Sequence, residues 1–96
     1  MTLDNAELFN CCTECLAPDW NEFDGLEIGG CITFVADDGT TITEGGTEDA
    51  GAQFWTVYGH CKWGGVEAIT DCATRDLAQT VAAELSRRSG LPITFA

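Results

Sequence analysis

Apolar residues near the start of the chain recur with the spacing of one face of an α-helix. The positions that would share this face over residues 4–16 are Leu8, Cys11, Cys12, Cys15 and Leu16. Residues 4–7, with Asp first and Glu last, have the form of a helix capping box. Pro18 ends the helix, because proline breaks the backbone hydrogen-bond ladder. The pattern predicts an N-terminal helix whose apolar face, rich in cysteine, packs on the core.

A second apolar stripe predicts a C-terminal helix that starts after Thr74 and ends at Gly90. The positions on this stripe are Leu77, Ala78, Val81, Ala82 and Leu85. Thr74 is a favourable N-cap, and Gly90 is a common residue after the last helical turn. Asp76 in the first turn and Arg87-Arg88 in the last turn suit the helix dipole.

Between the two helices the pattern changes to β-branched and aromatic runs separated by turn residues. Residues 31–36 and 40–43 lie on either side of an Asp-Gly pair, which predicts a first hairpin. Residues 54–61 and 66–72 flank a Gly-Gly pair, which predicts a second hairpin.

The remaining segments carry weaker signals. Residues 17–30 mix acids with aromatics and turn formers, so we expect mostly loop, with its aromatic side chains covering the core. Residues 44–53 read as a flexible acidic connection. Residues 93–95 predict a short strand at a sheet edge, because the preceding Pro92 cannot donate to a ladder.

These elements follow the order α-β-β-β-β-α-β, which predicts an α+β fold. We expect an antiparallel meander of four to five strands, made of two hairpins and the short C-terminal strand. The N-terminal and C-terminal helices would pack on it. The 96 residues suffice for a single domain over 1–96.

Charge separates the chain into two unlike parts. The protein has 16 acidic and 4 basic residues and a formal net charge of −12. No Lys or Arg precedes Lys62, so residues 1–61 carry this whole charge, and residues 62–96 are balanced. Such a field repels nucleic acid and anionic membranes and attracts basic surfaces. The alternative explanation is that the charge serves solubility or adaptation to a salty host.

The six cysteines fit reduced thiols inside the core better than a disulfide scaffold. The alternative is zinc, bound by Cys12 and Cys15 together with His60 and Cys61, or together with Cys31 and Cys72. Only one C-x-x-C pair is present, and adjacent strand residues point to opposite faces. We therefore expect no metal and no other cofactor.

The sequence offers no catalytic constellation. It has no P-loop, no dinucleotide-binding glycine motif and no nucleophile elbow, and the acid surplus disfavours a thiolate at a Cys–His pair. We expect a binding protein and not an enzyme. No apolar stretch approaches the roughly 18 residues of a membrane span. The first 30 residues lack the basic start of a signal peptide, so we expect the cytoplasm of a host cell.

Acidic and aromatic residues in the predicted loops and turns are the candidate partner-binding residues. They are Asp19, Trp20, Glu22, Asp24, Glu27, Asp37, Asp38, Glu44, Glu48 and Asp49. Trp63, beside the Gly-Gly turn, is hard to bury, and an exposed aromatic among acids is a good interface anchor.

The acidic stretches APDWNEFDGLEIGG, ADDGT and EGGTED give residues 1–61 a character that resembles small phage and mobile-element inhibitors of the anti-CRISPR type. This resemblance implies an inhibitor that occupies the basic groove of a CRISPR effector complex, with carboxylates standing in for phosphates. It lies in size, charge and composition, so no functional residue is carried over from the family. A small zinc or thiol module and a generic acidic interaction domain remain the alternatives.

Overall fold

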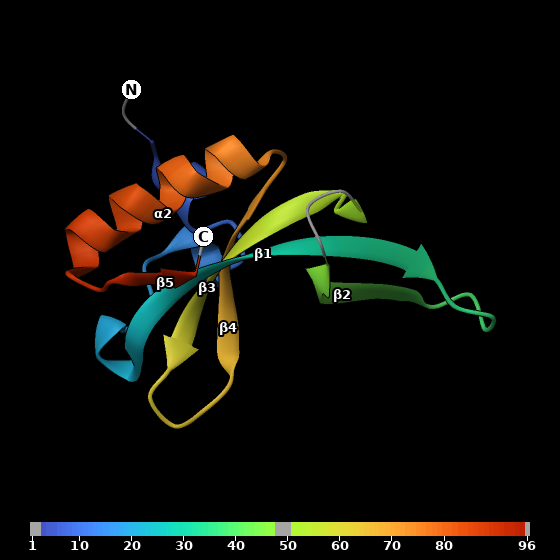
Figure 1. The fold of residues 1–96 in the computed structure, drawn as a ribbon, viewed down its shortest axis with the longest axis horizontal. Coiled ribbons are helices and arrows are strands. Elements are labelled where there is room, and N and C mark those ends of the chain that lie inside the picture. Colours follow the sequence, from blue (N-terminus) through green and yellow to red (C-terminus); the bar gives the residue numbers. More distant parts are fainter. Residues whose placement is uncertain (1–2, 48–50, 96) are drawn as a thin grey trace.

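A computed structural model, which describes residues 3–47 and 51–95, shows an α+β fold in which one long helix crosses a twisted sheet (Figure 1). The main elements are β1 (Phe23–Val35), β2 (Thr41–Thr47), β3 (Phe54–Cys61), β4 (Val66–Cys72) and α2 (Arg75–Ser89). The two predicted hairpins and the predicted C-terminal helix are all present. Among the described residues, no helix is long and apolar enough to cross a membrane.

The strands lie in the order β2-β1-β3-β4, and all three of these pairings are antiparallel. The predicted meander is wrong, because a meander would place β2 beside β3. The 13 residues of β1 explain the difference. Residues 23–31 of β1 pair with β3, and residues 30–35 pair with β2, so one strand serves both hairpins.

The loop predicted over residues 17–30 is also wrong for its second half, because β1 begins at Phe23. Leu26 and Ile28 point toward the helix-covered core, and Glu27 lies between them. Glycines in this strand make room for cross-strand aromatic rings. A Cβ at Gly29 would lie 3.1 Å from the Tyr58 ring.

The last strand, β5 (Ile93–Phe95), pairs with β1 in parallel and at two positions only, opposite Leu26 and Glu27. The Leu26 amide also donates to the Pro92 carbonyl at 2.8 Å. Because β3 occupies one side of this part of β1, β5 takes the other side, which β2 leaves open. The sheet is therefore antiparallel over four strands, and the short fifth strand departs from the predicted antiparallel pattern.

The N-terminal helix α1 (Asn5–Leu8) is far shorter than the predicted helix over 4–16. Its capping box forms as expected, with the Asp4 side chain accepting from the Glu7 amide at 2.9 Å. The chain then leaves the helix because Asn10 bonds to the edge of β4. The Asn10 side chain donates to the Asp71 carbonyl at 2.8 Å and accepts from the Asp71 amide at 2.7 Å.

This edge contact changes the surroundings of the cysteines. The Cys11 amide donates to the Ile69 carbonyl at 3.0 Å, so residues 10 and 11 cover the outer edge of β4. Cys11 is exposed, and Cys12 and Cys15 are half-buried, so the expected buried thiol stripe is absent. Two short 3₁₀ turns follow, η1 (Thr13–Cys15) and η2 (Trp20–Glu22).

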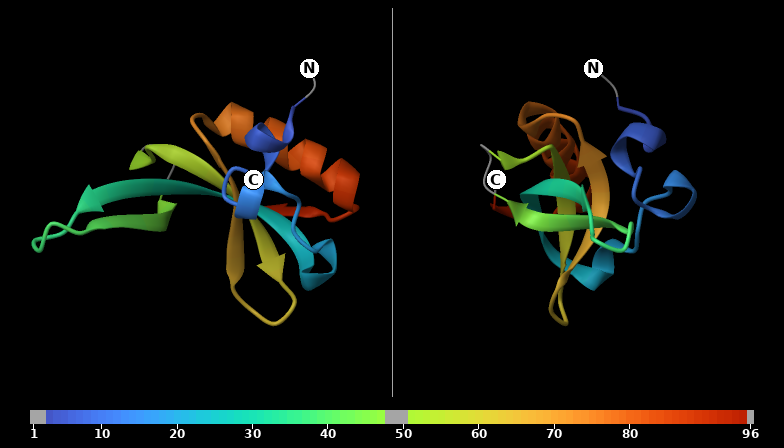
Figure 2. Two further views of the ribbon diagram at one scale, coloured as in Figure 1. Left: turned by 180° about the vertical axis from the view of Figure 1, so that it is seen from behind. Right: turned by 90° about the vertical axis from the view of Figure 1, so that its right-hand side faces the viewer.

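The core lies between α2 and one face of the sheet (Figure 2). The buried residues of α2 are Ala78, Val81, Ala82 and Leu85. They pack with Leu26, Val57 and Ile69 of the sheet. Thr74 caps the helix by accepting from the Leu77 amide at 3.1 Å, and Gly90 ends it at a φ of 77°. Leu77 is partly exposed, at the margin of the predicted stripe.

Replacing Gly59 with alanine should destabilise the fold. The new Cβ would lie 2.6 Å from the Phe23 ring, which is fully buried, so the strand or the ring must shift. Overpacking of this kind typically costs about 1–3 kcal/mol, and urea unfolding measures it. Gly29→Ala is the matched control with a smaller expected loss, because its neighbour Tyr58 is only half-buried. An unchanged midpoint for Gly59→Ala would contradict this packing.

Candidate functional site

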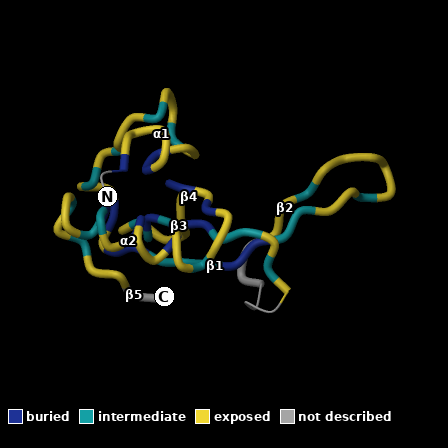
Figure 3. Tube along the Cα trace, turned by 90° about the horizontal axis from the view of Figure 1, so that it is seen from above, coloured by how far each residue is buried: buried dark blue, intermediate teal, exposed yellow. Residues whose placement is uncertain are grey.

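The two-stranded ribbon of residues 31–47, here called the acidic arm, extends beyond the helix-covered body (Figure 1). Pairing with β3 ends at Cys31, so residues 32–35 of β1 have a strand partner only in β2. No helix or strand of the described residues covers the arm as a second layer, and Figure 3 shows its outer part as largely exposed. Phe34 is 40% exposed and Val35 is 69% exposed.

The tip of the arm is a well-bonded turn that presents carboxylates. The Ala36 amide donates to the Thr40 carbonyl at 2.8 Å, and Gly39 adopts a φ of 86°. The Asp38 carboxylate accepts from the Thr40 amide at 2.9 Å, and hydrogen bonding by Thr40 lowers the pKa of Asp38. Asp37 and Asp38 are both exposed, so the tip carries negative charge at neutral pH.

Other predicted acids gather near a second feature, the turn between β3 and β4. The Lys62 amide donates to the Glu22 carbonyl at 3.0 Å, and His60 Nδ1 lies 2.6 Å from Asp24 Oδ1. The pKa of the Cys61 thiol is raised by partial desolvation and then by the charges of Glu67, Glu22 and Asp24. Glu67 lies on β4 opposite Gly59, so the residues that carry these three carboxylates adjoin the base of the turn.

The structure thus divides the predicted partner-binding residues between places instead of joining them on one face. Asp37, Asp38 and Glu44 are exposed on the arm, and Glu22 and Asp24 are exposed near the β3–β4 turn. Asp19 is exposed at the start of η2, which it caps. Glu27 is half-buried on β1 opposite Tyr58. Glu48 and Asp49 lie outside the described residues.

Trp20 takes a structural position and does not project as an anchor. Its ring lies 6.2 Å from the Phe9 ring and 6.3 Å from the Phe23 ring, measured between centroids. It is half-buried against the core cluster. The prediction that aromatics of residues 17–30 cover the core therefore holds for Trp20.

Two of the four basic residues are engaged within α2. Glu84 accepts hydrogen bonds from the Nε atoms of Arg87 and Arg88, at 3.1 Å and 2.8 Å. These partners lower the pKa of Glu84 to about 2, with hydrogen bonding as the largest cause. Both guanidinium groups thus stay near the C-terminal end of the helix, where the dipole favours positive charge.

The sheet face away from α2 holds a chain of polar contacts that the sequence did not reveal. Tyr58 OH lies 3.2 Å from Cys31 Sγ, which lies 3.3 Å from Thr56 Oγ1. Thr56 in turn donates to Asp71 Oδ1 at 2.7 Å. Partial burial, followed by the Cys31 hydrogen bond, raises the pKa of Tyr58 to about 12. The chain gives the buried side chains of Cys31 and Thr56 their polar partners and ends at the exposed residue Asp71.

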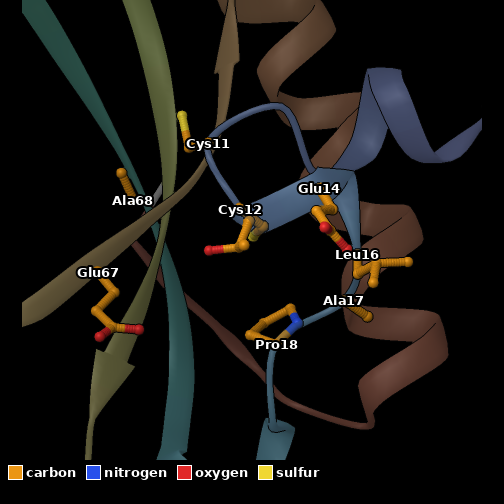
Figure 4. Close-up of a pocket in the computed structure, with 9 residues that line it drawn as sticks. Cys11, Cys12, Glu14, Leu16, Ala17, Pro18, Glu67 and Ala68 are labelled. Carbon is orange, nitrogen blue, oxygen red and sulfur yellow. The ribbon is translucent and has the colours of Figure 1, made fainter.

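A cavity of about 550 Å³ lies beside η1, at the edge of β4 (Figure 4). Its walls include Cys11, Cys12, Pro18 and Glu67. Desolvation, followed by the charge of Asp71, raises the pKa of Cys11 to about 12. Desolvation and then the charges of Glu67 and Cys15 raise the pKa of Cys12. Both thiols stay protonated at neutral pH, which makes them poor nucleophiles.

The zinc alternatives gain no geometric support. Within residues 3–47 and 51–95, no three side chains of the His, Cys, Asp or Glu type form a group that could hold a metal ion. Cys31 is buried on the sheet face opposite α2, whereas Cys72 belongs to the core under α2. Cys31 and Cys72 therefore cannot both join Cys12 and Cys15 around one metal ion.

Comparisons with protein-family models, with curated proteins and with solved structures find no match to this chain. The candidate site therefore stands on its own geometry. Sequence reasoning left Val66 and Glu67 out, although they follow the turn that carries Trp63. Pairing the two predicted strands of the second hairpin would have indicated both residues, because the register of β3 against β4 places Val66 opposite His60 and Glu67 opposite Gly59.

The free energy of unfolding should fall as the pH rises from about 8.5 to 10. Cys11 and Cys72 have pKa values of about 12 and about 11 in the folded protein, above the roughly 8.5 of an unfolded thiol. The folded state therefore keeps these protons longer, and their stabilisation is complete below the unfolded pKa and lost above it. Urea unfolding midpoints between about pH 8.5 and 10 measure this loss of stability. The range ends near the pH at which Tyr58 begins to ionise in the unfolded chain. The midpoint should fall less steeply with pH in the double variant Cys11→Ser/Cys72→Ala. A wild-type midpoint that does not change with pH would contradict the prediction.

Proposed function

We propose that this protein acts by binding and not by catalysis, and that it docks its acidic arm on the basic nucleic-acid-binding surface of a partner. The observation that carries the proposal is the arm itself: a two-stranded ribbon that extends past the body and places Asp37, Asp38 and Glu44 in solvent. A channel for nucleic acid is lined by Lys and Arg, which such carboxylates attract.

The shape of the arm supports this mode of binding. A two-stranded β-ribbon is narrow enough to enter a DNA major groove, which is roughly 12 Å wide. The ribbon is therefore narrower than a whole duplex, and a channel that accepts a duplex has room for it. The carboxylates of the arm lie at two places, with Asp37 and Asp38 in the turn at its tip and Glu44 on β2. The arm therefore has the width and the sign of charge that a basic channel accepts.

The apolar residues of the arm favour a protein partner over a role in solubility alone. A ribbon with no second layer is marginally stable by itself, and here its register is held by continuity with the body through β1. Phe34 and Val35 remain exposed beside the acids. Solubility requires only charge, whereas an interface combines apolar contact with charge complementarity.

CRISPR effector complexes are the partner class that we propose, because they hold a guide–target duplex in a positively charged channel. The arm would occupy this channel before DNA enters. The proposal extends the resemblance in size and charge to anti-CRISPR inhibitors, and the arm supplies the element that would make the contact.

A DNA shift assay with purified effector–guide RNA complexes tests the proposal. The protein should prevent target DNA binding at low salt, and the inhibition should weaken as salt rises, because exposed charges are screened. Asp37→Asn/Asp38→Asn should weaken inhibition roughly two- to thirtyfold, from about 0.2–1 kcal/mol for each exposed charge. The matched control is Glu14→Gln/Asp76→Asn, which removes two exposed charges outside the arm. Equal losses in both variants, or no inhibition of any complex, would contradict the proposal.

A further inference from the structure

The most exposed large apolar side chain among the described residues is Trp63, at 80%. It sits in the β3–β4 turn, which two backbone hydrogen bonds close. The Cys61 amide donates to the Gly65 carbonyl at 3.0 Å, and the Gly64 amide donates to the Cys61 carbonyl at 3.1 Å. Gly64 and Gly65 both have positive φ, of 103° and 77°, a conformation that suits glycine. The turn therefore presents the indole from a defined backbone.

The surroundings of the indole are apolar on one side and acidic at the base. Val66, the first residue of β4, is 46% exposed. Glu22 adjoins the turn, since its carbonyl accepts from the Lys62 amide, Asp24 contacts His60 at the end of β3, and Glu67 follows Val66 on β4, opposite Gly59. Lys62 is the basic residue of the turn, and it makes no ion pair with the described carboxylates. Three carboxylates against one ammonium leave this region negative.

We propose that the β3–β4 turn is a second binding surface, which takes an arginine-bearing segment of a partner protein. The face of Trp63 would receive the guanidinium, and the carboxylates of Glu22, Asp24 and Glu67 would attract it. A tryptophan face is the strongest aromatic partner for a cation, and arginine is the cation that most often stacks in this way.

The charge of the region excludes the other occupants. A second copy of this chain, itself at −12, would bring like charges together, and nucleic acid would bring phosphates to the same carboxylates. An uncharged apolar segment would cover Trp63 but would leave the surrounding acids without a partner. An arginine-bearing segment satisfies the ring and the carboxylates at once.

This surface is separate from the acidic arm. Cys61, at the base of the turn, pairs with Phe23 at the start of β1. The arm is built on the other end of that strand, which ends at Val35. Figure 1 shows the turn and the tip of the arm projecting in different directions. The inference therefore goes beyond the proposed function, and each can fail without the other.

The test is an NMR titration of the whole protein with a blocked peptide of four alternating Gly-Arg units at low salt. The indole N–H resonance of Trp63 should move, while those of half-buried Trp20 and Trp55 stay. Trp63→Ala should weaken binding about two- to fivefold, the size of a cation–π contact at an exposed site. Trp63→Phe should retain part of the affinity. A peptide with serine for arginine should not bind.

Two charge variants separate a local site from the general field of an acidic protein. Glu22→Gln/Asp24→Asn/Glu67→Gln should weaken peptide binding more than Asp37→Asn/Asp38→Asn/Glu44→Gln, although each removes three charges. Circular dichroism verifies that the first variant still folds without the His60–Asp24 contact. Equal losses, or an unaffected Trp63→Ala protein, would overturn the inference. Peptide binding without inhibition of an effector complex would contradict the proposed function and leave this surface standing.

Discussion

The length of β1 is the constraint on which the rest of the structure depends. Its 13 residues exceed what the helix-covered body needs, so the strand pairs with β3 along its first part and with β2 along its second. The first part is fixed by burial, since Phe23 and Leu26 are closed off from solvent. The second part has no such cover and becomes the arm. One continuous strand thus gives the molecule both a core and an extension, and the core holds the extension in register.

Local signals in the sequence predicted the elements that local interactions hold together. The C-terminal helix carries its own cap at Thr74, its own apolar stripe and its own stop at Gly90, so its pattern is nearly complete without the rest of the chain. The two hairpins likewise contain their own turns. The start of β1 could not be found in this way. Its glycines disfavour a strand until the Tyr58 ring of β3 lies over Gly29. In return, Phe23 of β1 places its ring over Gly59 of β3, so both contacts depend on the pairing of two strands.

The N-terminal helix failed for a related reason. Its apolar residues do recur at helical spacing. The Asn10 side chain, however, bonds to the carbonyl and the amide of Asp71, 61 residues away, and these bonds take the place of the next helical turn. The same contact covers the outer edge of β4, which would otherwise invite pairing with another chain. The candidate site followed the same rule. Composition located the acids, but only the topology could separate those of the arm from those of the β3–β4 turn.

This separation limits the repulsion between two groups of acids in a chain with a net charge of −12. The twelve residue steps of β1 from Phe23 to Val35, at about 3.3 Å each, set the two acidic regions up to roughly 40 Å apart along the strand. That is several times the roughly 8 Å over which physiological salt screens charge, so the regions scarcely repel each other. With the two binding modes proposed above, the same distance would make them two sites on one body. A partner that reaches only one of them would gain only one contact, whereas a partner large enough to reach both would gain the second at a high effective concentration. Selection among partners would then rest on the spacing of their basic patches as well as on their charge.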